Sequence, residues 1–210
     1  MNDLVPARLA VPPVVIGSSN WFDDRVTTRE SDGALRRLPR IPPVEEFDDA
    51  QREALDKTLF GTDGRPMNVF KTLAHQPKLL RRVNSLGGYF VVHGSIPVRE
   101  REIAILRTAA RAGCEYELAH HRRLAAEAGL DGDEIEAAID PAITHEWATA
   151  DRAVLRIADE LFERDAVADD SWDALADPFG DVGRLELLVL VGYYRMLAGV
   201  LNTVRVEVDA

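Results

Sequence analysis

The sequence has a single cysteine, Cys114, among its 210 residues. One thiol per chain excludes an intramolecular disulfide framework and any zinc site built from several cysteines. It also excludes a dithiol redox cycle within one chain, because that cycle needs one thiolate to attack and a second sulfur to form the disulfide. The chemistry of this protein therefore does not depend on paired sulfurs within the chain.

Basic residues are scarce relative to acidic ones. The chain has 25 Lys and Arg against 36 Asp and Glu, which gives a formal net charge of −11 at pH 7. The sequence pI is about 4.9. An acidic surface repels phosphate backbones and anionic lipid headgroups. Neither nucleic acid nor a membrane surface is therefore an expected partner.

The sequence also lacks a long uncharged apolar run. Its most apolar segment, residues 185–201, contains Glu186 and Arg195 and is short for a membrane-spanning helix. We interpret this segment as a buried core helix or a helix at a subunit interface. The first residues show no basic start followed by an apolar stretch, so no secretory signal is visible. The expected location is cytoplasmic.

Prolines are concentrated at the start of the chain, where six of the eleven precede Val44. Proline lacks an amide N–H and interrupts helices, so this density predicts an extended, Pro-rich N-terminal arm over residues 1–44. Such an arm would wrap the body or a neighbouring subunit. Over residues 45–210 apolar residues recur at helical spacing, and no strand pattern is visible. The sequence thus predicts an all-α domain after the arm.

Residues that begin or end helices divide this domain. Glycine commonly follows a helix, and proline is favoured in the first turn. The expected boundary residues are Gly61, Asn68 as an N-cap, Pro77, Pro97, Gly113, Gly129 and the capping-box pair Asp131 and Glu134. Within one expected helix, Gly87 and Gly88 indicate close packing or the wall of a small pocket.

Reactive side chains gather in residues 113–121, with the sequence GCEYELAHH. Residues three or four apart share one face of a helix. One stripe therefore consists of Cys114, Glu117 and His121, and an adjoining stripe of Tyr116 and His120. A turn at Gly113 would fold the preceding helix, which carries Glu102, back against this one. Two carboxylates and an imidazole would then converge.

That convergence suits proton transfer, because histidine titrates near neutral pH and burial raises the pKa of a glutamate towards the same range. Two less specific interpretations remain open. Glu117 and His121 are also spaced as a surface ion pair, and Glu102 is close enough in sequence to pair with Arg99 or Arg101. Cys114 taken alone is more typical of a small buried apolar residue than of a nucleophile.

A metal site is a further alternative, because Glu117 and His120 have the Glu-x-x-His spacing of di-iron helical bundles. Such a site needs a second motif of the same form and more carboxylates on other helices. The sequence contains no second Glu-x-x-His. We therefore expect no metal.

At these residues the chain resembles the carboxymuconolactone decarboxylase family, which includes the alkyl hydroperoxidase D-type (AhpD-like) proteins. The resembling stretches are Arg101–Ala109 with Glu102, Cys114–His121, Leu124-Ala125, Ala128–Leu130, Asp151–Leu155, Asp159–Leu161 and Val191–Tyr194. The resemblance implies an all-α, AhpD-like domain that forms homo-oligomers (a dimer, trimer or hexamer), with sites near subunit contacts.

The hydroperoxidase branch of that family has a Glu, a Cys-x-x-Cys pair and a following His. Carried onto this chain, the Glu falls on Glu102, the first Cys on Cys114 and the His on His121. The second Cys, which would attack peroxide, falls on Glu117. The chain instead fits the Tyr-Glu-x-x-x-His form of the decarboxylase-like branch. The resemblance then implies acid–base chemistry on a small organic acid or lactone, without a metal or an organic cofactor.

Our leading hypothesis is a cofactor-independent lyase or isomerase that acts on a small carboxylated or lactone-like metabolite. His121 is the general acid or base, Glu117 orients it and Glu102 relays protons. Tyr116 and His120 would hydrogen-bond the substrate or a developing enolate oxygen.

Two alternatives belong to other classes of protein. One is a peroxidase that uses Cys114 with an external thiol as the resolving group. The expected burial of this thiol, together with Glu115 and Glu117 beside it, argues against a reactive thiolate. The other alternative is a helical oligomer that binds a ligand without catalysis.

Overall fold

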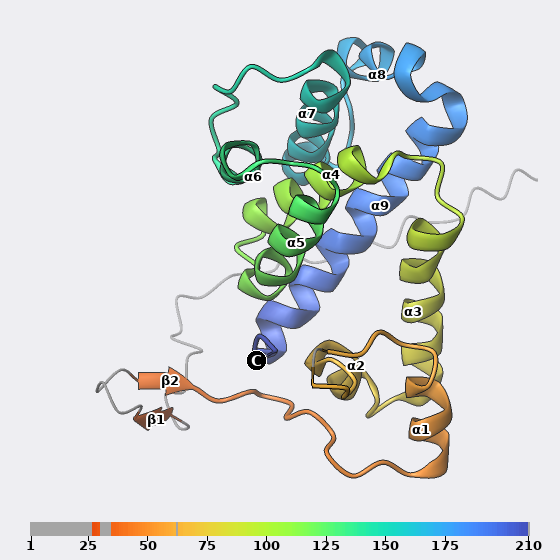
Figure 1. Ribbon diagram of the computed structural model, residues 1–210, viewed down its shortest axis with the longest axis vertical. Helices are drawn as coiled ribbons and strands as arrows, with labels where there is room; N and C mark the ends of the chain where they lie inside the picture. Colours follow the sequence, from red (N-terminus) through yellow and green to blue (C-terminus); the bar gives the residue numbers. More distant parts are fainter. Residues whose placement is uncertain (1–26, 30–34, 62, 210) are drawn as a thin grey trace, which may run out of the picture. The chain divides into compact units, whose positions relative to one another are not determined.

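The computed structural model describes residues 27–29, 35–61 and 63–209 (Figure 1). Contacts divide the chain into two units, residues 1–37 and 38–210. In the first unit, β1 (Thr27–Arg29) pairs antiparallel with β2 (Leu35–Arg37), and Thr27 lies opposite Arg37. Both strands lie in the segment expected to be an extended arm, outside residues 45–210, for which no strand was expected. Strands of three residues are too short to show the alternation by which a strand is recognised in sequence.

The arm expected over residues 1–44 falls partly in each unit. Its last residues, 38–44, belong to the second unit. There the Arg40 N–H donates to the Val204 carbonyl oxygen at 2.8 Å, and His75 Nε2 lies 2.9 Å from the Pro42 carbonyl oxygen. Residues 1–26, where docking of the arm was expected, lie outside the described part of the chain.

The second unit is all-α over its described residues, as the sequence predicts. Its helices are α1 (Asp49–Leu55), α2 (Asn68–Leu73), α3 (Pro77–Val92), α4 (Val98–Arg111), α5 (Glu115–Glu127), α6 (Gly132–Ile139), α7 (Thr149–Arg164), α8 (Asp169–Ala174) and α9 (Ala176–Val204). Pro77 begins α3, and Asp131 with Glu134 forms the expected capping box of α6. Gly113 and Gly129 follow α4 and α5 with φ of 58° and 92°, a backbone conformation that favours glycine.

The start of α2 differs from the expectation. Asn68 is the first residue inside the helix, and Met67 before it makes no side-chain cap. The Asn68 N–H instead donates to Asp209 Oδ1 at 2.8 Å, from a residue 141 positions away. The cap comes from the C-terminal segment, which a local pattern does not reveal.

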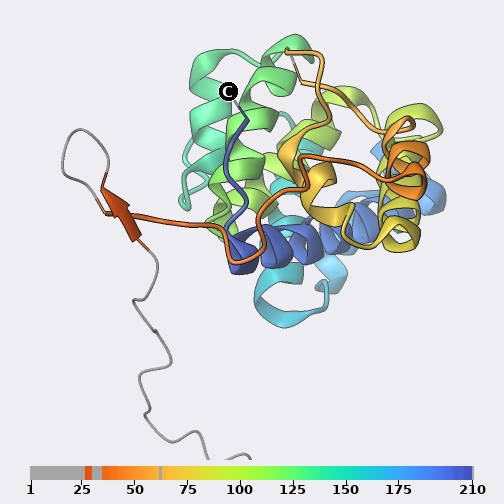
Figure 2. The same ribbon diagram turned by 90° about the horizontal axis from the view of Figure 1, so that it is seen from below.

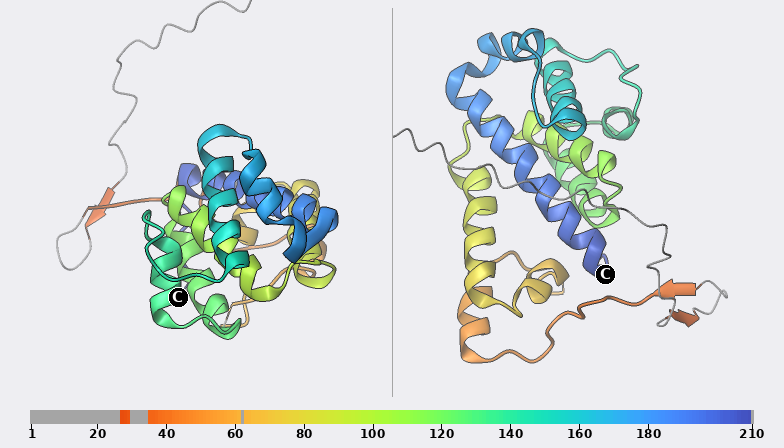
Figure 3. Two further views of the ribbon diagram at one scale, coloured as in Figure 1. Left: turned by 90° about the horizontal axis from the view of Figure 1, so that it is seen from above. Right: turned by 180° about the vertical axis from the view of Figure 1, so that it is seen from behind.

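Helix α4 lies at the centre of this unit and packs against α5, α6, α7 and α9. Its residues 102–109 are all buried, so it has neighbours on every side. In the view from behind, α9 runs diagonally past α4, and α7 and α8 lie near the beginning of α9 (Figure 3). A smaller apolar cluster of Ala54, Leu55, Ala74 and Leu80 joins α1 and α3. Helix α4 therefore sets the positions of the elements that carry the candidate site.

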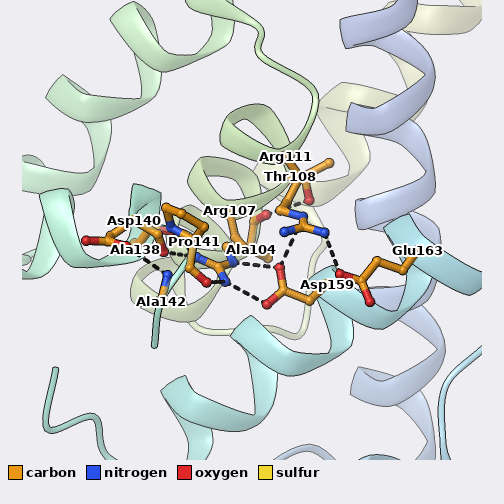
Figure 4. A network of polar contacts seen from close by, with 10 residues as sticks. All are labelled: Ala104, Arg107, Thr108, Arg111, Ala138, Asp140, Pro141, Ala142, Asp159 and Glu163. Atoms are coloured by element: carbon orange, nitrogen blue, oxygen red, sulfur yellow. Dashed lines mark hydrogen bonds and ion pairs between the residues drawn. The ribbon is translucent and has the colours of Figure 1, made fainter. Parts of the chain in front are cut away.

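The side chain of Arg107 fixes α4 against its neighbours (Figure 4). This residue is fully buried, and its Nε and Nη2 donate to the two oxygens of Asp159 on α7 at 2.7 and 2.6 Å. Its remaining N–H groups donate to the carbonyl oxygens of Asp140 and Pro141, just after α6. A two-point arginine–carboxylate pair holds both distance and angle. Arg107 therefore joins α4, α6 and α7.

Helix α9 is long and apolar enough to cross a membrane by length and composition, with a mean hydropathy of 1.5. It nevertheless packs against α4, α7 and α8. Its buried Glu186 accepts hydrogen bonds from the Ser95 N–H at 2.7 Å and the Ser95 hydroxyl at 2.6 Å. These contacts are those of a core helix. A stripe on α9 stays exposed within the single chain and consists of Val182, Leu185, Val189, Met196 and Val200.

The two adjacent glycines of α3 have different surroundings. A Cβ on Gly87 would lie 2.6 Å from the hydroxyl oxygen of Tyr193, whereas a Cβ on Gly88 would meet nothing within 4 Å. Tyr193 donates from that hydroxyl to the Val83 carbonyl oxygen at 3.2 Å. The close packing predicted from the sequence is therefore confirmed at Gly87.

Alanine substitutions at these two positions should have opposite effects on stability. We expect Gly88→Ala to raise the free energy of unfolding by about 0.5–1 kcal/mol, because alanine is the better helix former. Gly87→Ala should lower it by about 1–3 kcal/mol, because the added methyl displaces the Tyr193 ring. Urea unfolding of both variants measures the difference. An equal gain at both positions would show that Tyr193 moves aside without cost.

Candidate active site

The turn at Gly113 brings the reactive residues of α4 and α5 together. The Cys114 N–H donates to the Ala109 carbonyl oxygen at 2.9 Å, which closes the turn. Helix α5 then runs back along α4, and the two are in extensive contact. Glu102 on α4 and His121 on α5 thereby meet, although they lie 19 positions apart.

The centre of the site is the His121 ring between two carboxylates. Its Nδ1 lies 2.7 Å from Glu102 Oε2, in a buried hydrogen bond. Its Nε2 lies 3.3 Å from Glu117 Oε2, one helical turn earlier. The exposed fractions of Glu102, Glu117 and His121 are only 1, 4 and 8%. The convergence predicted from the sequence is confirmed, and the interpretation of Glu117 and His121 as a surface pair is wrong.

Two further side chains complete the surroundings of His121. Arg101 Nε donates to the other oxygen of Glu102 at 3.1 Å, and Arg101 Nη1 donates to the Phe90 carbonyl oxygen at 3.1 Å. The local Arg101–Glu102 pair considered from sequence is therefore present alongside the His121 contact. The Tyr194 ring of α9 meets the His121 ring edge to face, with centroids 5.2 Å apart.

This environment favours the protonated form of His121. Burial lowers the pKa of the ring, but the contacts with Glu102 and Glu117 outweigh it and raise the pKa to about 9. An imidazolium has an N–H on each nitrogen, and a carboxylate faces each one here. At neutral pH the group is therefore a proton donor in its resting state.

Tyr116 and His120, on the adjoining stripe of α5, face the C-terminal segment. The Tyr116 hydroxyl donates to Asp209 Oδ2 at 2.6 Å and accepts the Val69 N–H at 3.2 Å. His120 Nε2 lies 3.2 Å from the same Asp209 oxygen. These two side chains, expected to hydrogen-bond a substrate, thus contact a carboxylate of the chain itself.

Cys114 is fully buried at the start of α5. Burial raises the pKa of its thiol to about 11, with the negative charges of Glu117 and Glu115 acting in the same direction. The thiol is therefore neutral at physiological pH, as the sequence predicts. A neutral thiol is a poor nucleophile towards peroxide.

The described residues contain no group of three or more His, Cys, Asp or Glu side chains arranged to hold a metal ion. In the cluster itself, Glu102 and Glu117 face opposite nitrogens of His121 rather than a common point. A cavity of about 770 Å³ lies elsewhere, beside α1 and α3. Its lining includes four basic residues, Lys57, Lys78, Arg81 and Arg82.

Sequence reasoning missed two residues of this site, Asp209 and Tyr194, and one contact of a third, Arg101. Asp209 gave no signal, because it lies 93 positions from Tyr116 and outside any motif. Tyr194 belongs to a stretch that resembles the family, but its spacing does not show that it faces His121. The sequence suggested Arg101 as a partner of Glu102. It did not reveal the hydrogen bond from Arg101 to the Phe90 carbonyl oxygen, which orients the Arg101 side chain.

Solved structures with the same fold include AhpD-like proteins. A peroxidase-related protein with an alkylhydroperoxidase AhpD core, from Ralstonia eutropha JMP134, is similar over 83% of this chain and 94% of its own, with 20% identity and a TM-score of 0.69. A peroxidase-related protein from Silicibacter sp. TM1040 is similar over 81 and 90%, with 16% identity and a TM-score of 0.68. The debrominase Bmp8 is similar over 81 and 92%, with 17% identity and a TM-score of 0.62. These likenesses establish an all-α AhpD-like fold.

Within that fold, residues 77–160 match the carboxymuconolactone decarboxylase family. This stretch runs from α3 into α7 and carries Glu102, Cys114, Glu117 and His121. The resemblance seen in the sequence is therefore confirmed. A search of curated proteins found no match. This match supports an enzymatic function.

The raised pKa of His121 predicts how stability depends on pH. The folded protein holds this proton more tightly than the unfolded chain, where the pKa is near 6.5. The stabilisation is therefore fully present below pH 6.5 and is lost as the pH rises through about 9. We expect the free energy of unfolding to fall by on the order of 3 kcal/mol over this range, at about 1.4 kcal/mol per pKa unit.

Denaturant unfolding at a series of pH values tests this prediction. His121→Asn should remove most of the dependence between neutral pH and pH 9, whereas His93→Asn, at an exposed position after α3, should retain it. If the free energy of unfolding of the wild type depends on pH no more steeply than that of His121→Asn, the buried ring is neutral.

Proposed function

We propose that the protein is a cofactor-independent acid–base enzyme of the decarboxylase or isomerase type, and that its substrate is a small carboxylated or lactone-like metabolite. The observation that carries this proposal is the buried His121 ring, with a carboxylate 2.7 Å from one nitrogen and another 3.3 Å from the other. A histidine held protonated in a water-poor interior is equipped to deliver a proton.

The proposed reaction assigns one step to each group. Loss of CO2 from a carboxylated substrate breaks a C–C bond and leaves the electron pair on carbon or on a conjugated enolate oxygen. His121 donates its proton to that carbon and becomes neutral. Glu117, 3.3 Å from Nε2, then passes a proton from water to the ring, and the hydroxide left behind combines with the released CO2 to form bicarbonate. Glu102 keeps the ring oriented through Nδ1 and stabilises its charged form.

The alternative of a peroxidase rests on Cys114 and on the peroxidase-related names of two similar structures. The raised pKa of this thiol opposes it. The position of the attacking thiol in the family pattern also holds Glu117 rather than a cysteine. We therefore rank acid–base chemistry first, and a ligand-binding protein without catalysis remains the third candidate.

Substitutions at the cluster test the acid–base proposal. With a panel of small carboxylated lactones, beginning with carboxymuconolactone, we expect His121→Asn and Glu117→Gln to lower kcat by about 10²–10⁴-fold. Cys114→Ala should leave the rate largely unchanged. Product analysis by NMR in D2O should show deuterium at the carbon that lost CO2. The rate should also fall above about pH 9, as His121 loses its proton.

Peroxide treatment separates the competing functions. Formation of a stoichiometric sulfenic acid at Cys114, with reductant-dependent turnover that Cys114→Ala abolishes, would replace acid–base chemistry by peroxide reduction. Full retention of every measured activity and binding property in both His121→Asn and Cys114→Ala would leave only the non-catalytic candidate.

The exposed apolar stripe of α9 supports a homo-oligomer, since a stripe of this kind is normally covered. It includes Val189 and Met196, with exposed fractions of 42 and 46%. We propose that a second copy of the chain covers it.

Light scattering should give a multiple of the 23.3 kDa chain mass. Val189→Asp and Met196→Asp should shift the protein towards monomer, and Ala126→Asp, at an exposed position of α5, should not. A monomeric wild-type protein at micromolar concentration would contradict the proposal.

A further inference from the structure

The carboxylate of Asp209 is surrounded by donors from two helices. Its Oδ1 accepts the Asn68 N–H at 2.8 Å, and its Oδ2 accepts the Tyr116 hydroxyl at 2.6 Å. His120 Nε2 lies 3.2 Å from Oδ2. Burial raises the pKa of Asp209, but the contacts with His120, Tyr116 and Asn68 outweigh it and hold the pKa below its usual value. The surroundings therefore favour an anionic carboxylate.

The surroundings of Tyr116 require a hydrogen-bond acceptor next to its hydroxyl group. The side chain is 95% buried, since its exposed fraction is 5%. Its hydroxyl oxygen already accepts the Val69 N–H at 3.2 Å. The hydroxyl proton therefore needs a separate acceptor, because a buried donor without one is costly. Asp209 supplies that acceptor in this structure.

His120 fits the Asp209 carboxylate less well. Its ring lies against the Tyr116 ring, with centroids 4.5 Å apart, which sets the direction of Nε2. Nε2 is buried and close to Asp209 Oδ2, yet the contact lacks the angles of a hydrogen bond. A carboxylate attached to the chain is limited by its backbone. A free carboxylate has no such restriction and is able to meet Tyr116 and His120 together.

The segment that carries Asp209 is short and follows α9 directly. Helix α9 ends at Val204, and the Val206 N–H donates to the Leu201 carbonyl oxygen at 3.1 Å. Asn68 Nδ2 donates to the Glu207 carbonyl oxygen at 3.1 Å. Figure 2 shows this segment leaving the end of α9, and its Asp209 contacts Asn68 of α2 and Tyr116 of α5. Loss of the Asp209 contacts would free the end of the segment without opening the core.

We propose that Tyr116 and His120, with the Asn68 amide, form a carboxylate-binding subsite, and that Asp209 occupies it as an internal ligand until a small carboxylate replaces it. As a substrate subsite this rests on the proposed function. Tyr116 and His120 each precede a residue of the acid–base cluster, Glu117 and His121, on the same two turns of α5. A substrate anchored here by its carboxylate would lie beside the proton donor.

The test uses the full chain with Asp209→Ala and sodium acetate as the probe. Removal of the internal carboxylate should lower the Tm. Acetate at about ten times its Kd should then raise the Tm by about 3–6 °C by mass action. It should also shift the NMR signals of the His120 ring along a saturable curve. Wild type should respond much less, because Asp209 competes for the subsite. Asp209→Asn, which keeps the side-chain shape, should respond between the two.

Several controls identify the subsite as the cause. Acetamide, a neutral molecule of the same shape, and sodium chloride at equal ionic strength should not reproduce the effect. Asp173→Ala, at an exposed acidic position of α8, should show no acetate response. Adding Tyr116→Phe to Asp209→Ala should weaken acetate binding at least tenfold, since it removes a buried hydrogen bond to a charged group.

Two results would overturn the proposal: an acetate response of Asp209→Ala no greater than that of wild type, or one unaffected by Tyr116→Phe. Asp209 would then be a structural latch only. Acetate binding is measured without turnover, and His121→Asn combined with Asp209→Ala should still bind acetate. Failure of the acid–base proposal would therefore be seen separately from failure of the subsite.

Discussion

A fully buried guanidinium, that of Arg107, sets the frame on which the site is built. A charge in the interior is tolerated only when partners replace the water it has lost. Arg107 meets this condition through both oxygens of Asp159 and through carbonyl oxygens after α6. These partners fix α4 against α6 and α7. Glu102 lies on the same helix, so its position relative to α6 and α7 depends on this pairing, and the Gly113 turn sets the position of α5 beside it.

The same requirement governs the candidate site. Glu102 and Glu117 are buried carboxylates, and the protonated His121 ring between them, with Arg101 beside Glu102, balances their charge. Burial acts in opposite ways on the two groups that could do chemistry here. Burial lowers the pKa of His121, but the two carboxylates outweigh this effect and raise the pKa to about 9. Burial raises the pKa of the Cys114 thiol, and the nearby glutamates act in the same direction, so that this pKa reaches about 11. Both shifts favour proton donation over thiolate chemistry.

Two peroxidase-related proteins and a debrominase have the same fold, with sequence identities of 16–20% to this chain. A shared fold hosts different chemistries, and the side chains of the site decide among them. In this chain the deciding residue is Glu117, which stands where the hydroperoxidase pattern has a thiol. The C-terminal segment adds a second feature, a carboxylate placed among donors next to that residue.

The sequence by itself determined the helical class, the main helix boundaries and the meeting of Glu102, Glu117 and His121. These depend on local rules: the spacing of apolar residues, the Gly113 turn and the i,i+4 geometry of α5. Only the tertiary structure decided the protonation of His121, because its pKa depends on burial and on the approach of Glu102 from another helix. The structure alone also revealed the Asp159 partner of Arg107, the packing of Tyr193 on Gly87 and the Asp209 contacts. Each joins residues far apart in the chain, and no local pattern encodes which of several acidic residues reaches a given donor.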